Sequence, residues 1–159
     1  MLTRHKTIIL IIKHLIMSEL LKLNQVNLTY QTGDESIKVL KDIDLKTMKK
    51  ETISFVGESG SGKTSLIMLI AGLEKATSGQ IFFQNKEISG LSEDEVSKIR
   101  RKNIGIVFQS FYLIPNYTAV ENVALILELN NFKSPTNQAK AILERMRLKH
   151  RFNNLPSQL

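Results

Sequence analysis

The sequence contains no cysteine, no internal repeat and no apolar run long enough to cross a bilayer. Without cysteine the chain has neither a disulfide framework nor a thiolate metal site, and a reducing cytosol is its natural compartment. The apolar stretch Thr7–Met17 is interrupted by Lys13 and His14. It is shorter than the roughly 20 residues that a membrane-spanning helix requires, and it lacks the small-residue cleavage site of a signal peptide.

The start of the chain is expected to lie outside the folded domain. A regular strand pattern begins only after Met17, so we expect translation to start there. Residues 1–16 are then a non-native or disordered extension, and residues 17–159 form the domain. A weak anchor on a membrane surface is the alternative interpretation of residues 1–16.

Charge and composition indicate a globular domain. Hydrophobic residues make up 42% of the chain and charged residues 23%, close to the globular averages. The net charge of +7 could indicate a nucleic-acid or anionic-lipid partner. Three of the cations, Arg4, Lys6 and Lys13, lie in the doubtful extension, however, and the others are spread along the chain. We interpret them as a solvated surface.

The first half of the chain predicts strands, a loop and a helix. Loosely alternating apolar residues over Leu20–Tyr30 and Ile37–Leu45 predict two strands, and the polar stretch between them predicts an antiparallel pair. Thr52–Val56 is short, apolar and β-branched, as expected of a buried strand. Ser65–Ala71 is apolar on nearly every side and predicts a buried helix, which Gly72 ends.

The second half predicts two more strands and three helices. Strands are expected at Gln80–Phe83 and Ile104–Phe108. Two capping-box pairs, Ser92 with Glu95 and Thr118 with Glu121, each predict the start of a helix. A last helix is expected near Ser134-Pro135, with one apolar face. The two apolar stripes after Thr118 are Val120, Val123, Ala124 and Leu127, and then Ala139, Ile142, Leu143 and Met146.

The segment Gly57-Glu58-Ser59-Gly60-Ser61-Gly62-Lys63-Thr64 fits the phosphate-loop pattern G-x-x-x-x-G-K-[ST] at every position. Glycines keep side chains out of the way, so that successive backbone N–H groups can surround a polyphosphate. The helix that starts near Lys63 points its positive end at the same oxygens. We expect Lys63 to reach the β- and γ-phosphates and the Thr64 hydroxyl to ligate Mg²⁺. The loop alone indicates purine nucleotide binding.

Around this loop the chain resembles the ATP-binding subunits of ABC transporters. The resemblance runs from about Leu21 to Leu159 and rests on several separate segments. They are VLKDIDL (39–45), the phosphate loop, LIAGLEKATSGQIFF (69–83), IGIVFQ (104–109) and FYLIPNYTAVENV (111–123). The sequences TGDESIKVL and VFQSFYLIP further resemble the lipoprotein-release and macrolide-export branch, most of all the YbbA-type subunits.

The resemblance implies a fold, a ligand and partners. The fold is an α/β P-loop NTPase core of the ABC ATPase type, with an antiparallel β-subdomain and part of the helical subdomain. The cofactors are ATP and Mg²⁺, the latter held by Thr64 and Gln109. The partners are a membrane permease that docks on Phe111–Val123 and a second ATP-binding subunit, alike or different. The nucleotide-binding residues are Tyr30, whose ring stacks on adenine, with Gly57, Glu58, Ser59, Gly60, Ser61, Gly62, Lys63, Thr64, Ser65 and Gln109.

The resemblance also implies a location and a task. Such subunits are cytoplasmic and peripheral on the inner face of the cell membrane. They couple ATP binding and hydrolysis to the export or extraction of amphipathic cargo at the envelope.

The sequence departs from the family pattern in what it lacks. The signature motif, of which Leu159 would be the first residue, is missing. So are the Walker B aspartate, the catalytic glutamate and the switch histidine, and Lys50 replaces a usual glycine. We therefore expect an N-terminal fragment with no catalytic residues, negligible hydrolysis and low stability, in which Ile53 and Phe55 are exposed.

Other interpretations remain open. Tyr30 could be only a strand aromatic, and Gln109 only a polar residue at a strand end. The fragment could serve as a non-catalytic nucleotide-binding or permease-docking module. A DNA-repair or translation protein of the same superfamily would have no need of the segment 111–123, so no nucleic-acid partner is expected.

Overall fold

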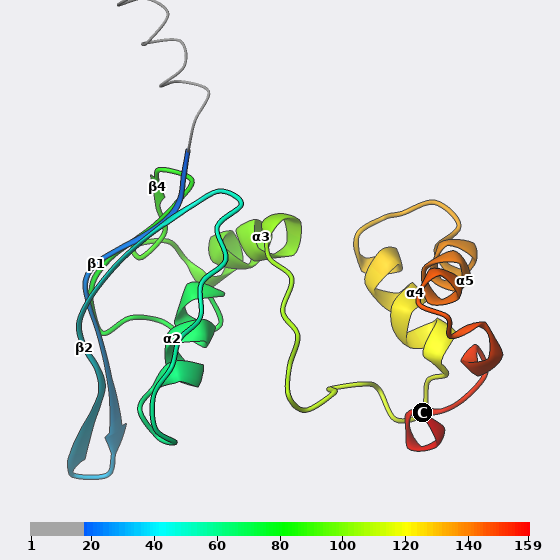
Figure 1. Ribbon diagram of the computed structural model, residues 1–159, viewed down its shortest axis with the longest axis horizontal. Coiled ribbons are helices and arrows are strands. Elements are labelled where there is room, and N and C mark those ends of the chain that lie inside the picture. The colour runs from blue at the N-terminus through cyan, green and yellow to red at the C-terminus, as the bar shows by residue number, and fades with distance from the viewer. Residues whose placement is uncertain (1–17) are drawn as a thin grey trace, which may run out of the picture. The chain divides into compact units, whose positions relative to one another are not determined.

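The computed structural model describes residues 18–159, which divide into two units, one ending at Ile106 and the other beginning at Val107 (Figure 1). Each unit is described by itself. The expectations about residues 1–16 and the start at Met17 lie outside the described residues.

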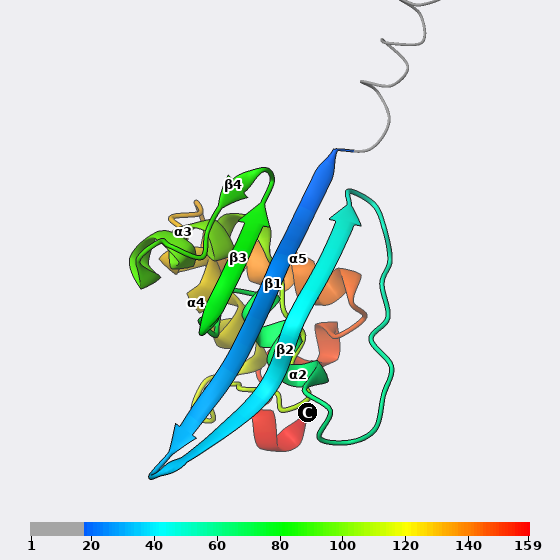
Figure 2. The same cartoon turned by 90° about the vertical axis from the view of Figure 1, so that its left-hand side faces the viewer.

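A four-stranded antiparallel sheet dominates the first unit. Its strands are β1 (Glu19–Thr32), β2 (Glu35–Met48), β3 (Ser78–Phe83) and β4 (Lys86–Glu87), in the order β2-β1-β3-β4 (Figure 2). The predicted antiparallel pair is thus confirmed, with Leu23 opposite Leu45 in the register.

A bulge keeps the apolar residues of β1 on one face of the sheet. The spacing of buried residues changes from two to three between Leu23 and Val26, where the register to β2 shifts. Gln25, inside this step, has a φ of 47°. The extra residue flips the alternation back, so that Leu23 and Val26 both enter the core.

Two helices belong to the first unit. Helix α2 (Lys63–Ile70) contributes Leu66 and Leu69 to the same core as the sheet. Ile67 is 46% exposed, so the expectation that α2 is buried on nearly every side was wrong for this face. Helix α3 (Glu93–Asn103) begins at Ser92 with the predicted capping box.

Two predicted strands are not formed. Thr52–Val56 and Ile104–Phe108 are apolar and extended in character, but neither is a strand in the structure. A strand requires backbone partners, and residues 18–159 supply no neighbouring strand for either segment. As expected, Ile53 is exposed, at 37%, whereas Phe55 is half-buried.

The second unit is a pair of helices followed by two 3₁₀ turns. Helices α4 (Ala119–Leu129) and α5 (Pro135–Arg145) pack together through a small core, and the turns are η1 (Lys149–Arg151) and η2 (Pro156–Gln158). The buried core residues are Ala119, Val120, Ala124, Ala139 and Leu143.

The helix starts in the second unit follow the prediction, but the apolar face of α5 does not. Thr118 caps α4 with the predicted capping box, and Pro135 opens α5. Ile142 and Met146, expected on the buried face of α5, are 40% and 68% exposed. A single helical neighbour covers only a narrow stripe. No helix within residues 18–159 is long and apolar enough to span a membrane.

Candidate nucleotide-binding site

Two left-handed glycines shape the phosphate loop. Gly60 has a φ of 82° and Gly62 a φ of 86°, a region that other residues enter only with strain. The Ser61 N–H donates to the Glu58 carbonyl at 3.3 Å, which closes the tip of the loop. Helix α2 then starts directly from Gly62, whose carbonyl accepts from the Leu66 N–H at 2.9 Å.

Gly62 also fits closely against strand β2. A Cβ atom at this position would lie 3.0 Å from the Val39 carbonyl oxygen and 3.1 Å from Leu40 Cδ2. The loop and the start of α2 therefore rest on the backbone of β2, and only glycine allows this approach.

The Lys63 ammonium group folds back over the loop. Its Nζ donates to the carbonyls of Gly57 at 2.9 Å and Glu58 at 2.5 Å, and lies 3.3 Å from Ser61 Oγ. Among residues 18–159 no carboxylate forms an ion pair with Lys63. The charge is therefore available to phosphate oxygens, which could replace these neutral acceptors with stronger, charge-assisted ones.

A cavity of about 420 Å³ opens at the loop, large enough for the phosphates of a nucleotide. Its lining residues are Val39, Ser59, Gly60, Gly62, Lys63, Thr64 and Ser65. The described residues contain no cluster of three metal-ligating side chains. Thr64 in the lining offers one hydroxyl as a ligand for Mg²⁺, which usually takes water and substrate phosphates as its other ligands.

Tyr30 lies beside the start of α2. Its hydroxyl donates to Glu74 Oε2 at 3.0 Å. Burial of the hydroxyl raises the pKa of Tyr30; Ser65 opposes this shift, and the Glu74 carboxylate adds to it. The structure thus brings Tyr30 and Ser65 together. It also adds Glu74, which the sequence analysis missed.

Gln109 and the segment 111–123 belong to the second unit. Gln109 is exposed, and its place beside the phosphate loop stays a prediction. Phe111 and Tyr112 are 86% and 75% exposed, and the Tyr112 ring packs edge-to-face on Phe108 with the centroids 4.9 Å apart. The segment 111–123 therefore presents large aromatic side chains outward.

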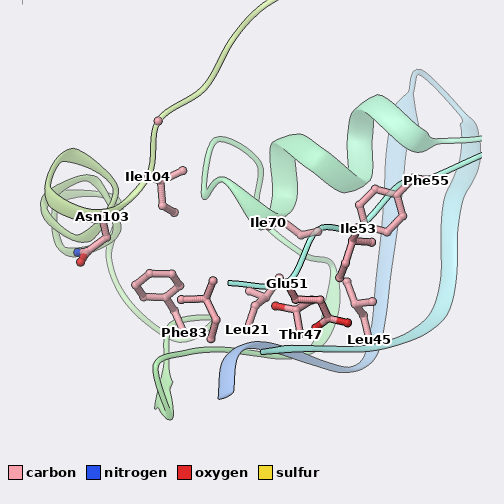
Figure 3. A pocket seen from close by; sticks show the side chains of 12 residues that line it. Leu21, Leu45, Thr47, Glu51, Ile53, Phe55, Ile70, Phe83, Asn103 and Ile104 are labelled. Carbon is pink, nitrogen blue, oxygen red and sulfur yellow. The ribbon is translucent and has the colours of Figure 1, made fainter. Parts of the chain in front are cut away.

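A second cavity of the first unit, of about 350 Å³, is apolar (Figure 3). Its labelled side chains include Leu21, Ile53 and Phe83. Glu51 is its one ionisable lining residue, and the Glu51 carboxylate already accepts from the Met48 N–H at 2.7 Å. A cavity lined by a carboxylate and no cation does not suit a polyphosphate, whereas the cavity at the loop is lined by Lys63.

The loop with left-handed glycines leads into a helix N-terminus, and the Lys63 ammonium group folds back over the loop. This combination defines a P-loop nucleotide-binding protein. The ABC transporter family matches residues 40–159, and the chain belongs to this family.

Two similar proteins carry the name of an ATP-binding protein. The lipoprotein-releasing system ATP-binding protein LolD of Idiomarina loihiensis is 39% identical over 143 residues, which cover 88% of this chain and 62% of that protein. The uncharacterized ABC transporter ATP-binding protein YbbA of Escherichia coli K12 is 40% identical over 129 residues, covering 80% and 57%. The chain thus spans about three fifths of the length of these relatives.

A solved structure confirms the fold. The dimeric, post-hydrolysis structure of the ATP-binding cassette MJ0796, bound to ADP and Pi, superposes with a TM-score of 0.80 at 38% identity. The match covers 87% of this chain and 62% of that one. The core of the ABC ATPase fold is therefore present in part.

Proposed function

We propose that this chain binds MgATP at the loop Gly57–Thr64, as the nucleotide-binding part of a transporter ATPase. The observation that carries the proposal is the loop itself, with Gly60 and Gly62 left-handed and Lys63 poised over it without a carboxylate partner in the described residues. Thr64 would hold Mg²⁺, and Gln109 is the second residue that we propose for this ion. The ion would offset phosphate charge; the chain's own residues bind and orient the nucleotide.

The wider task follows from the relatives. LolD is named for lipoprotein release, so we propose that the complete protein drives export or extraction of amphipathic cargo at the cell envelope. It would work on the inner face of the membrane and pair with a second ATP-binding subunit. The exposed aromatic residues of segment 111–123 would dock on the permease.

Binding of nucleotide to the 159-residue chain tests the proposal. Isothermal titration with MgATP should give saturable binding, and Lys63→Ala should weaken it at least about tenfold, since hydrogen bonds to charged groups are worth about 1.5–3 kcal/mol. Lys98→Ala, an exposed lysine of helix α3, is the matched control. Equal affinity of the parent chain and Lys63→Ala would refute a phosphate-binding role for the loop.

A non-catalytic docking module is the second candidate. It is favoured by the outward aromatic side chains of segment 111–123. Co-purification of the tagged chain with a permease, lost in Phe111→Ser but retained in Lys63→Ala, would support docking independent of nucleotide. Failure of the tagged chain to co-purify with any permease would exclude it.

A further inference from the structure

Glu74 is placed opposite Tyr30 by an extension of the β1–β3 pairing. The Thr77 N–H donates to the Asn27 carbonyl at 2.8 Å, and Thr77 Oγ1 accepts from the Thr29 N–H at 2.9 Å. The chain before β3 therefore continues alongside the end of β1. Three residues ahead of Thr77, the Glu74 carboxylate reaches the Tyr30 hydroxyl at 3.0 Å.

The other side of Glu74 is fixed by the end of helix α2. Gly72 has a φ of 68°, and its N–H donates to the Leu69 carbonyl at 3.0 Å. The Leu73 N–H donates to the Met68 carbonyl at 2.9 Å, which completes a Schellman motif. A Cβ at Gly72 would lie 2.6 Å from Val96 Cγ1, so Val96 of helix α3 packs closely against the turn that ends α2. Glu74 therefore lies between two fixed segments, the end of α2 before it and Thr77 after it.

The contact joins the tyrosine to the phosphate loop. A carboxylate that accepts from a hydroxyl makes a charge-assisted hydrogen bond, stronger than a neutral one. Ser65, whose side chain lowers the pKa of Tyr30 and so lies beside its hydroxyl, lines the cavity at the loop. The hydroxyl end of Tyr30 is therefore fixed, and the side chain remains 37% exposed, which leaves part of the ring open to a ligand.

We infer that Glu74 is a positioning residue, whose carboxylate holds the Tyr30 hydroxyl and so presets the aromatic ring as a platform for the base of the nucleotide. This rests on the proposed ATP binding. A ring that is already ordered loses less conformational entropy when a base stacks on it. Glu74 then affects recognition of the base and leaves the binding of phosphates unchanged.

The opposing view is that the contact only fastens the end of β1. In that case the loss of Glu74 would loosen helix α2 through Ser65. It would then lower the affinity for every phosphate-containing ligand by a similar factor. A comparison of MgATP with Mg-tripolyphosphate, which has the phosphates but no base, separates the two views.

The experiment measures Kd for both ligands by isothermal titration. Glu74→Ala should weaken MgATP about threefold to tenfold, since the tyrosine ring must then be ordered when the ligand binds. Tripolyphosphate affinity should stay within about twofold. Glu74→Gln, whose amide oxygen still accepts from the tyrosine, should retain most of the ATP affinity. Glu35→Ala, at the exposed start of β2, is the matched control.

A double-mutant cycle ties the effect to the contact. Tyr30→Phe keeps the ring but removes the hydroxyl, so it should match Glu74→Ala, and the double variant should be no weaker than either. Equal losses for both ligands, additive losses, or unchanged ATP affinity would each overturn the role of Glu74. If the parent chain binds tripolyphosphate and ATP equally, the base platform is absent although the phosphate loop functions. If it binds neither, the proposed function itself fails.

Discussion

Asn122 holds residues 114–118 through one side chain, and its replacement should release this part of segment 111–123 locally. Its Oδ1 accepts from the Ile114 N–H at 2.8 Å. Its Nδ2 donates to the carbonyls of Ile114, Tyr117 and Thr118 at 3.2, 2.9 and 3.1 Å. Because Asn122 sits in the first turn of α4, this network fixes residues 114–118 to the start of the helix.

The cost of Asn122→Ala can be worked out from these bonds. The two hydrogens on Nδ2 are shared among three carbonyls, so about three hydrogen bonds are lost, counting the Ile114 N–H. At about 1 kcal/mol net for each, opening of the segment becomes easier by about 3 kcal/mol. The Ile114 amide should then exchange its hydrogen about a hundredfold faster.

Hydrogen exchange resolved at single amides is the assay, and Asn130 supplies the matched control. Asn130 ends the same helix and makes one such bond, from Nδ2 to the Ile126 carbonyl at 2.8 Å. Asn130→Ala should leave exchange at Ile114 unchanged. If Asn122→Ala also leaves exchange at Ile114 within about threefold of the parent chain, the network contributes less than one hydrogen bond and the reasoning is wrong.

Further predictions concern glycines and acid. Gly79→Ala should destabilise the β1–β3 pairing by about 2–5 kcal/mol, measured by hydrogen exchange in β3, because Gly79 has a φ of 92° and its Cβ would lie 2.4 Å from the Gln25 carbonyl oxygen. Gly33→Ala, with a φ of 61° and open space, should cost only about 1–2 kcal/mol. The pKa of Glu121 is lowered by hydrogen bonds from the Thr118 hydroxyl and N–H, so its stabilisation of α4 is present above the ordinary value of 4.5 and is lost as the pH falls through the lowered pKa. Circular dichroism should show a loss of helical signal at acid pH. Glu121→Gln, which still accepts both bonds, should make this signal less dependent on pH.

Local chemistry made much of the fold predictable. The capping boxes at Ser92 and Thr118 predicted helix starts at the residues where the structure has them, because a cap is decided within four residues. The glycine pattern predicted the loop, and Gly60 and Gly62 have the left-handed φ angles that such a loop requires. These features depend on near neighbours in the sequence.

Features set by distant partners were not predictable in the same way. Thr52–Val56 has the composition of a strand, but composition cannot supply the neighbouring backbone that a strand requires. The predicted buried face of α5 included Ile142 and Met146, which are exposed. The width of this face depends on how much of α5 is covered by α4, which the sequence of α5 does not specify. Glu74 escaped notice because its contact with Tyr30 joins residues 44 positions apart, and no spacing rule links them.

The loop keeps its geometry although the segment before it is not in a sheet. Val56, next to the loop, is 94% exposed, whereas Phe55 before it packs on the core. The loop is also supported by β2, whose Val39 carbonyl would lie 3.0 Å from a Cβ at Gly62, and by helix α2, whose Leu66 and Leu69 are buried in the core. Because β2 and α2 are both formed within the first unit, they shape the loop although Thr52–Val56 is not paired in the sheet. The proposed nucleotide binding should therefore depend on the packing of α2 against the sheet, and Leu69→Ala, which removes a buried side chain from that packing, should weaken it.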